Sequence, residues 1–268
     1  MLKDITLGQY FPGNSVAHKL DPRTKILLVT LYIIALFSAK GLVGYAVMIA
    51  TLAACVKVSH VGLKSLVRGL KPLVVIIVFT GVLNVFFTPD THYLWEWGIL
   101  RISVKGVENA LFMVVRIMLL VMGTFLMTYT TSPIRLTDGL ESLLNPLKKI
   151  HVPVHELAMM MAIALRFIPT LIEETDKIMS AQKARGADFE SGSLFQKAKA
   201  LVPILVPLFI SAFRRADELA TAMECRCYHG GEGRTKLHVL KYQRRDYVAL
   251  TGGAVILVLV VVLRRLGA

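Results

Sequence analysis

Two arginines in similar surroundings are the residues of this sequence best suited to hold a partner. Each has a small residue on either side, which gives the triplets Ala184, Arg185, Gly186 and Cys225, Arg226, Cys227. A guanidinium offers five donors in a rigid fork that fits a carboxylate, and small neighbours let a partner surface close around it. An ordinary cation that complements the dipole at a helix C-terminus is the alternative interpretation.

The residues that precede the two arginines also match, at a constant spacing of 41 positions. The matching pairs are Asp176 and Asp217, Ile178 and Leu219, Ser180 and Thr221, Ala181 and Ala222, and Arg185 and Arg226. The repeat indicates two equivalent helices that end in equivalent docking residues. Such a pair suits a partner with twofold or pseudo-twofold symmetry.

Other residues that could support chemistry are less convincing. His151 and His155 have metal-like spacing, but Pro153 between them spoils the single helix face that two ligands need. Cys225 and Cys227 have no further ligand set nearby. Because the sequence contains no Walker motif, nucleophile elbow or HExxH motif, we expect no active site, metal or cofactor in this chain.

The composition predicts that these elements belong to a membrane protein. The 268 residues are 55% hydrophobic, with a mean hydropathy of +0.61. Five uncharged blocks predict membrane spans, at 26–39, 41–56, 72–89, 117–134 and 247–263, the fourth starting near Gly106. In this context the net charge of +13 favours anionic lipid over nucleic acid as the partner.

Loop charges predict which side of the membrane each end faces. The loop between the second and third spans holds His60, Lys64, Arg68 and Lys71 without an acid, so it is expected in the cytoplasm. The N-terminus is then cytoplasmic, and the fifth span leaves the C-terminus outside. Arg264 and Arg265 fit poorly there.

The segment 135–245 differs from both a span and a soluble loop. It holds 17 of the 31 Lys and Arg residues and 12 of the 18 Asp and Glu residues, yet it also contains apolar runs. We predict a short helix at 137–147, capped by Thr137 or Asp138, and long amphipathic helices at 154–184 and 200–228. The predicted fold is therefore an all-α polytopic membrane protein with about five transmembrane helices and long amphipathic cytoplasmic helices. Its domains are a four-helix membrane domain at 1–134, a cytoplasmic amphipathic-helix domain at 135–245 and a final span at 246–268.

Two local structures are predicted near the ends of spans. Asp21 should cap the first membrane helix with Pro22 at its first position, while Arg23 and Lys25 rest at the inner headgroups. Arg116, inside the fourth span, is expected to contact a neighbouring helix.

The motifs together resemble the T component (EcfT) family of energy-coupling factor (ECF) transporters, which is related to the cobalt-type transporter permeases. Residues 8–25, GQYFPGNSVAHKLDPRTK, match the family's opening signature, which includes Pro12, Gly13, Asp21, Pro22, Arg23, Thr24 and Lys25. The triplet around Arg185 matches the first Xaa-Arg-Xaa motif of the family. The triplet around Arg226 matches the second in position, although an Ala-Arg-Gly-like triplet is commoner there.

The resemblance implies a non-catalytic subunit in the plasma membrane of a prokaryote. Its expected partners are two ABC-type ATPases, which bind ATP and magnesium and receive one arginine triplet each. The other expected partner is a substrate-binding S component for a vitamin or metal ion, or several interchangeable ones. The S component is expected on the apolar helix faces, with candidate contacts at Met159, Met160, Met161, Ile163 and Phe167. Ordinary helix packing is the alternative for each of these five.

Two other classes of protein remain open at the level of sequence. A permease subunit of another ATP-driven transporter, which binds its own substrate in the bundle, predicts substrate affinity in the isolated chain. An intramembrane enzyme predicts a cluster of ionisable groups within the spans, where only Glu108 and Arg116 are found.

Overall fold

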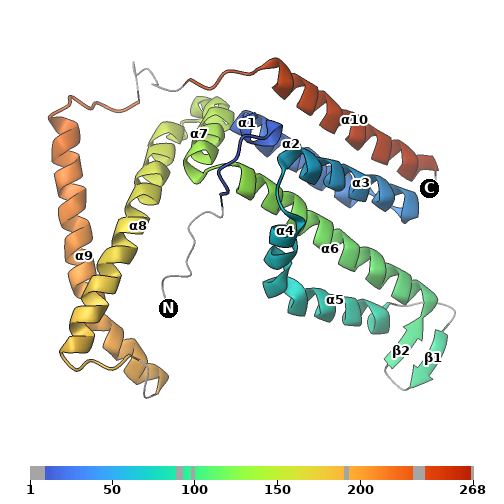
Figure 1. The fold of residues 1–268 in the computed structure, drawn as a ribbon, viewed down its shortest axis with the longest axis horizontal. Helices are drawn as coiled ribbons and strands as arrows, with labels where there is room; N and C mark the ends of the chain where they lie inside the picture. The colour runs from blue at the N-terminus through green and yellow to red at the C-terminus, as the bar shows by residue number, and fades with distance from the viewer. Residues whose placement is uncertain (1–9, 89–92, 98–99, 190–192, 232–238, 267–268) are drawn as a thin grey trace. The chain divides into compact units, whose positions relative to one another are not determined.

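The computed structural model describes residues 10–88, 93–97, 100–189, 193–231 and 239–266. The chain forms two compact units. One contains Gly8–Leu140 and Leu240–Ala268, and the other contains Glu141–Val239. Figure 1 shows the elements of both units, which are described separately below.

The first unit is a bundle of apolar helices arranged around α6. Its elements are α1 (Val16–Lys19), α2 (Pro22–Ser38), α3 (Gly41–Ser59), α4 (Leu63–Leu70), η2 (Lys71–Leu73), α5 (Val74–Phe87), β1 (Tyr93–Trp97), β2 (Leu100–Ser103), α6 (Val104–Thr130) and α10 (Arg244–Leu266). Helix α6 packs against α2, α3, α4 and α5, while α10 packs against α2 and α3. Leu36, Met48 and Leu119 lie in the shared core. Many large apolar residues face outward, among them Val75 at 76% exposed and Val248 at 71%, as expected for helices surrounded by lipid.

Five helical segments are long and apolar enough to cross a membrane. They are Gly41–Ser59, Leu63–Phe87, Val104–Thr130, Val154–Ala184 and Arg244–Leu266. Four of them contain or overlap predicted spans, and the prediction that the fourth span begins near Gly106 is confirmed by α6. The remaining predicted span is α2, whose 17 residues lie at the short end of the range for a bilayer. The one segment that was not predicted to be a span is α8, in the second unit. The apolar residues in its N-terminal half raise the mean hydropathy of this helix.

The helical fold class is confirmed, with one addition. Strands β1 and β2 pair antiparallel before α6, in a loop that the sequence analysis left without regular structure. Arg116 behaves as predicted, because its Nε donates to the Tyr45 hydroxyl on α3 at 2.8 Å. This bond gives a charged group inside the bundle a polar partner on a neighbouring helix.

The second unit consists of η3 (Asn145–Ile150), α8 (Val154–Ala184) and α9 (Leu194–Glu224), following α7 (Pro133–Leu144). Helix α8 begins after Pro153 as predicted. Helix α9 begins six residues earlier than predicted, because Ser193 and Gln196 form a capping box at its start. The predicted start of α7 was wrong. The helix begins at Pro133, and the Thr137 hydroxyl donates to the Ile134 carbonyl inside it.

Candidate partner-docking site

The two arginine triplets lie at helix ends with the same backbone structure. Helix α8 ends at Ala184 and α9 at Glu224, so both arginines sit in the turn that terminates a helix. Two backbone hydrogen bonds close each turn, from Gly186 N to Lys183 O and Ala187 N to Gln182 O, and from Cys227 N to Glu224 O and Tyr228 N to Met223 O. Both turns are Schellman motifs. Every donor and acceptor of the second is 41 positions after its counterpart in the first, so the sequence repeat is also a structural repeat.

The residue after each arginine adopts a left-handed conformation. Gly186 has φ of 87° and Cys227 has φ of 54°. Glycine takes this conformation without steric cost, whereas cysteine does not. The departure from the commoner Ala-Arg-Gly pattern therefore falls on the position where glycine is favoured by backbone geometry.

Both arginine side chains are available for a partner. All six residues of the two triplets are exposed. Within the described ranges, neither Arg185 nor Arg226 makes a side-chain hydrogen bond or ion pair, whereas Arg215 on α9 is bound to Glu174. Two free guanidinium groups on an exposed turn are suited to carboxylates of another chain.

The crossing of α8 and α9 places the two triplets far apart. Glu174 on α8 accepts hydrogen bonds from Ser211 Oγ and from Arg215 Nη2, the latter at 2.9 Å. Further along α8, Gln182 Nε2 reaches the carbonyl of Pro203, which is earlier in α9, at 3.4 Å. The helices therefore run past each other in opposite directions, as Figure 1 also shows.

The repeat also fixes where this crossing lies. Glu174 and Arg215 are equivalent positions, and each lies eleven residues before its docking arginine. At 1.5 Å per residue, Arg185 and Arg226 are each about 16 Å from the crossing, on opposite sides of it. The unit thus presents two equivalent arginine turns, one on each side of the crossing.

The candidate S-component residues lie in the N-terminal half of α8. Met160 is 55% exposed, and Met159, Met161, Ile163 and Phe167 are half-buried. Helix packing alone does not account for Met160. The histidine in the same region is held by its own chain, since His155 Nδ1 lies 3.0 Å from a Glu141 carboxylate oxygen.

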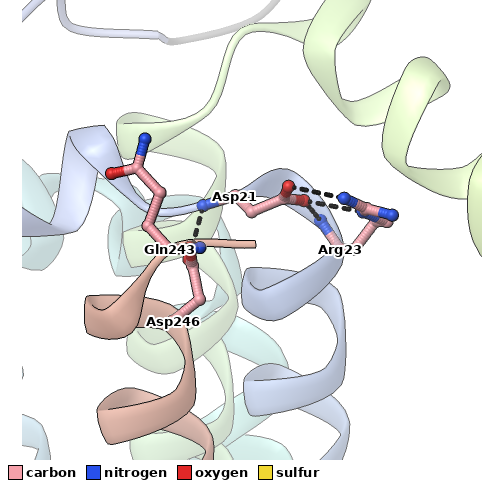
Figure 2. A network of polar contacts seen from close by, with 4 residues as sticks. All are labelled: Asp21, Arg23, Gln243 and Asp246. Carbon is pink, nitrogen blue, oxygen red and sulfur yellow. Dashed lines mark hydrogen bonds and ion pairs between the residues drawn. The ribbon is translucent and has the colours of Figure 1, made fainter. Parts of the chain in front are cut away.

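The N-terminal signature forms a joint between helices of the first unit. Asp21 caps α2 by accepting from Arg23 N at 2.9 Å, and Pro22 is the first residue of that helix, as predicted. The Asp21 amide donates to Asp246 Oδ1 at 2.8 Å, and the other oxygen of Asp246 accepts from Gln243 N. Figure 2 shows how this carboxylate ties the start of α10 to the start of α2.

The prediction that Arg23 and Lys25 rest among headgroups was wrong. Arg23 pairs with Asp21 and lies 4.1 Å from the centre of the Tyr242 ring. Lys25 is only 6% exposed, and its ammonium donates to Thr130 O at 2.8 Å and Thr131 Oγ1 at 3.0 Å. Both cations therefore have hydrogen-bond partners within the protein, as buried charged groups require.

The remaining signature residues support the same joint. Gly13 lies so close to His18 that an added Cβ would be 2.8 Å from the ring. His18 in turn is bonded to Ser15 Oγ and the Phe11 carbonyl. Thr24 is fully buried, and Pro12 is exposed. Sequence analysis missed Asp246 and the Thr130 carbonyl, because nothing in the local pattern links them to residues more than a hundred positions away.

The fold and site define a multi-pass membrane protein that carries two matched turns, each with an exposed arginine. Residues 13–237 match the CbiQ family, described as cobalt transport protein. The chain is 55% identical over 267 residues to the energy-coupling factor transporter transmembrane protein EcfT of Clostridium kluyveri, covering 99% of this chain and 98% of that protein. It is 52% identical over 263 residues to the protein of the same name from Ruminiclostridium cellulolyticum, covering 98% of each. The Bacillus subtilis protein of that name is 46% identical over 264 residues, covering 98% of this chain and 100% of its own length.

The chain therefore belongs to the CbiQ family and, within it, to the EcfT proteins, the energy-coupling transmembrane components of ECF transporters. It is a multi-pass protein of the plasma membrane and a non-catalytic subunit.

Proposed function

We propose that this chain transmits the motion of two ABC-type ATPase subunits to a substrate-binding S component, with Arg185 and Arg226 as the two points of attachment. The supporting observation is the pair of exposed arginines in equivalent Schellman turns on either side of the α8–α9 crossing. In this mechanism each guanidinium binds carboxylates or carbonyls of one ATPase. When the ATPases approach or separate on binding and hydrolysing ATP, the two tips move and the crossing transmits that movement.

The energetic demand on each contact is consistent with this role. A hydrogen bond to a charged group contributes about 1.5–3 kcal/mol. Leaving a buried partner carboxylate unpaired costs about 3–5 kcal/mol. Loss of one arginine should therefore weaken ATPase association at least about tenfold, since 1.4 kcal/mol is a factor of ten.

The test is co-purification in mild detergent of the chain, the two ATPases and the S component. The double variant Arg185→Glu, Arg226→Glu should reach the membrane normally but lose both ATPases. Arg166→Glu with Arg214→Glu is the matched control, because these two arginines are also exposed on α8 and α9. The control should keep both ATPases. Undiminished ATPase recovery with the double variant refutes the docking assignment.

Natural cysteines provide a second test that leaves the arginines unchanged. Cys225 and Cys227 are exposed on either side of Arg226. Maleimide should label both thiols in the isolated chain and neither in the assembled transporter. Labelling is normalised to the amount of chain, because Cys55 lies within the membrane-spanning helix α3 and should react poorly in both states. Equal labelling of Cys225 and Cys227 with and without the ATPases would count against docking at this turn.

The apolar surface around Met160 is the proposed contact for the S component. The substrate, a vitamin or a metal ion, is bound by that partner in this scheme. Met160→Glu should release the S component and retain the ATPases, while Met160→Leu should retain both because it preserves an apolar side chain of similar volume. Loss of the ATPases with the S component still bound contradicts this assignment. Substrate affinity of the isolated chain would instead support a permease that binds its own cargo.

A further inference from the structure

The corner between α3 and α5 exposes a cationic surface that the docking function does not use. Helix α4 is held against α6 by one of its faces. Leu66 and Leu70 are buried on that face, and the Tyr129 hydroxyl of α6 donates to the Ser65 carbonyl at 3.4 Å. Gly69 lies so close to Phe125 that an added Cβ would be 2.5 Å from the ring. The orientation of α4 around its own axis is therefore fixed.

This orientation leaves two adjacent stripes of α4 uncovered. Leu63 and Val67, one helical turn apart, are 64% and 56% exposed. Lys64 and Arg68, which are also one turn apart and lie beside the apolar pair, are exposed as well. An exposed apolar stripe beside a cationic stripe is the arrangement that places a helix at a membrane surface, with its apolar side toward acyl chains.

Among the described residues, the surroundings add positive charge, and the helices that form the corner carry no carboxylate. Lys57 and His60, at the end of α3, and Lys71, after α4, are exposed. The sequence contains no Asp or Glu from residue 22 to residue 89, nor from residue 109 to residue 137, which includes the part of α6 that carries α4. A cavity of about 470 Å³ at the same corner is lined by Ala53, Val56, Lys57, His60, Val61 and Leu63. The corner thus combines exposed cations with a cavity lined mainly by apolar side chains.

We propose that this α3–α4 corner binds the headgroup of an anionic phospholipid in the inner leaflet. Lys64 and Arg68 contact the phosphate, and Leu63 and Val67 lie against the acyl chains. Lipid is favoured over a protein partner because α4 forms the charged end of the segment Leu63–Phe87, and the charged end of a membrane-spanning segment lies near the bilayer surface, where anionic headgroups are abundant. Figure 1 shows that the chain changes direction between α4 and α5. The short helix η2 lies between them and contains Pro72.

The test is titration of the purified full-length chain in detergent with phosphatidylglycerol, with bound lipid counted by native mass spectrometry. The variant Lys64→Gln, Arg68→Gln should bind about 10- to 30-fold more weakly, because each cation near an anionic surface contributes a few-fold in affinity. Phosphatidylcholine should bind the original chain and the variant equally.

Arg264→Gln with Arg265→Gln is the matched control, since it removes two exposed cations from the end of α10. It should leave the tight phosphatidylglycerol site intact. An unfolding temperature in detergent equal to that of the original chain confirms that both variants are folded, and retained ATPase binding separates this proposal from the docking function. Equal lipid binding by the α4 variant and the original chain overturns the proposal. Loss of the S component without any change in lipid binding also overturns it, and identifies the corner as a protein contact.

Discussion

Glu174 forms an ion pair with Arg215, the residue 41 positions later in the chain, so one bond joins equivalent positions of the two repeated helices. Contacts between equivalent positions occur where a pseudo-twofold axis passes, because only there do repeated elements meet their own counterparts. The ion pair therefore marks the pseudo-twofold axis that relates the two arginine turns.

Breaking this ion pair should loosen the crossing without touching the docking residues. Both side chains are partly exposed, so Glu174→Gln should cost only about 0.5–1 kcal/mol of stability. The larger effect is expected on coupling, with less substrate taken up per ATP hydrolysed in reconstituted vesicles. The exchanged pair Glu174→Arg, Arg215→Glu restores opposite charges and should recover part of the coupling. Equal loss in the exchanged pair and in Glu174→Gln contradicts a role for the ion pair itself.

The left-handed conformation of Cys227 leads to a prediction about stability. Replacing it by glycine should remove about 1–2 kcal/mol of steric cost, offset by less than 1 kcal/mol from the greater chain entropy of glycine. Cys227→Gly should therefore keep or modestly raise the thermal unfolding temperature in detergent and keep ATPase binding, because Arg226 is unchanged. Gly186→Ala should lower the thermal unfolding temperature. There is open space around Gly186, but its left-handed backbone conformation alone disfavours a side chain. A lower unfolding temperature for Cys227→Gly would contradict this account.

The membrane helices and the repeat could be predicted because their signals are local. Uncharged blocks and flanking cations are sufficient to predict α3, α5, α6 and α10. The similarity of the segments that end at Arg185 and Arg226 is visible in the sequence itself. The start of α7 was misplaced because Thr137 looks like a cap, yet its hydroxyl bonds a carbonyl of the same helix. The local sequence could not distinguish a threonine that caps the start of a helix from one whose hydroxyl bonds a backbone carbonyl inside the helix.

The N-terminal joint could not be predicted for a different reason. A basic residue at the start of a membrane helix usually lies among headgroups, and that general rule was applied to Lys25. Its actual partners, Thr130 and Thr131, are over a hundred residues away at the end of α6. Only the packing of α2 against α6 brings Lys25 close to these two residues. No periodicity in the sequence indicates a contact between residues so far apart in the chain.

Asp246 is predicted to stabilise the association of α10 with α2. It is 1% exposed, and its two oxygens accept from the Asp21 and Gln243 amides at 2.8 Å each. Asp246→Ala leaves the buried Asp21 amide without this partner and should cost about 1–3 kcal/mol, to which the Gln243 amide, at an exposed residue, adds less. Asp246→Asn, which keeps one acceptor oxygen, should cost less. Thermal unfolding in detergent measures both, with exposed Asp217→Ala as a control expected within about 0.5 kcal/mol of the original chain.

Lys25 should stabilise the same end of the bundle by a different connection. Its ammonium satisfies the Thr130 carbonyl, which lies in the last turn of α6 and has no amide of that helix to bond. Lys25→Met retains the length of the side chain but removes the donor, so we expect a loss of about 1–3 kcal/mol in the free energy of unfolding. The matched control is Lys19→Met, because Lys19 is exposed and should contribute less than about 0.5 kcal/mol.

The two lysine variants also distinguish a structural joint from a docking residue. ATPase binding at low temperature should be unchanged in Lys25→Met, because both arginine turns belong to the other compact unit. The stability loss should appear as a lower unfolding temperature and as faster proteolysis of the segment between α6 and α7. Equal unfolding temperatures for Lys25→Met and Lys19→Met would show that the buried ammonium contributes nothing to the joint. Loss of the ATPases from Lys25→Met at low temperature would instead extend the docking surface to the N-terminal signature.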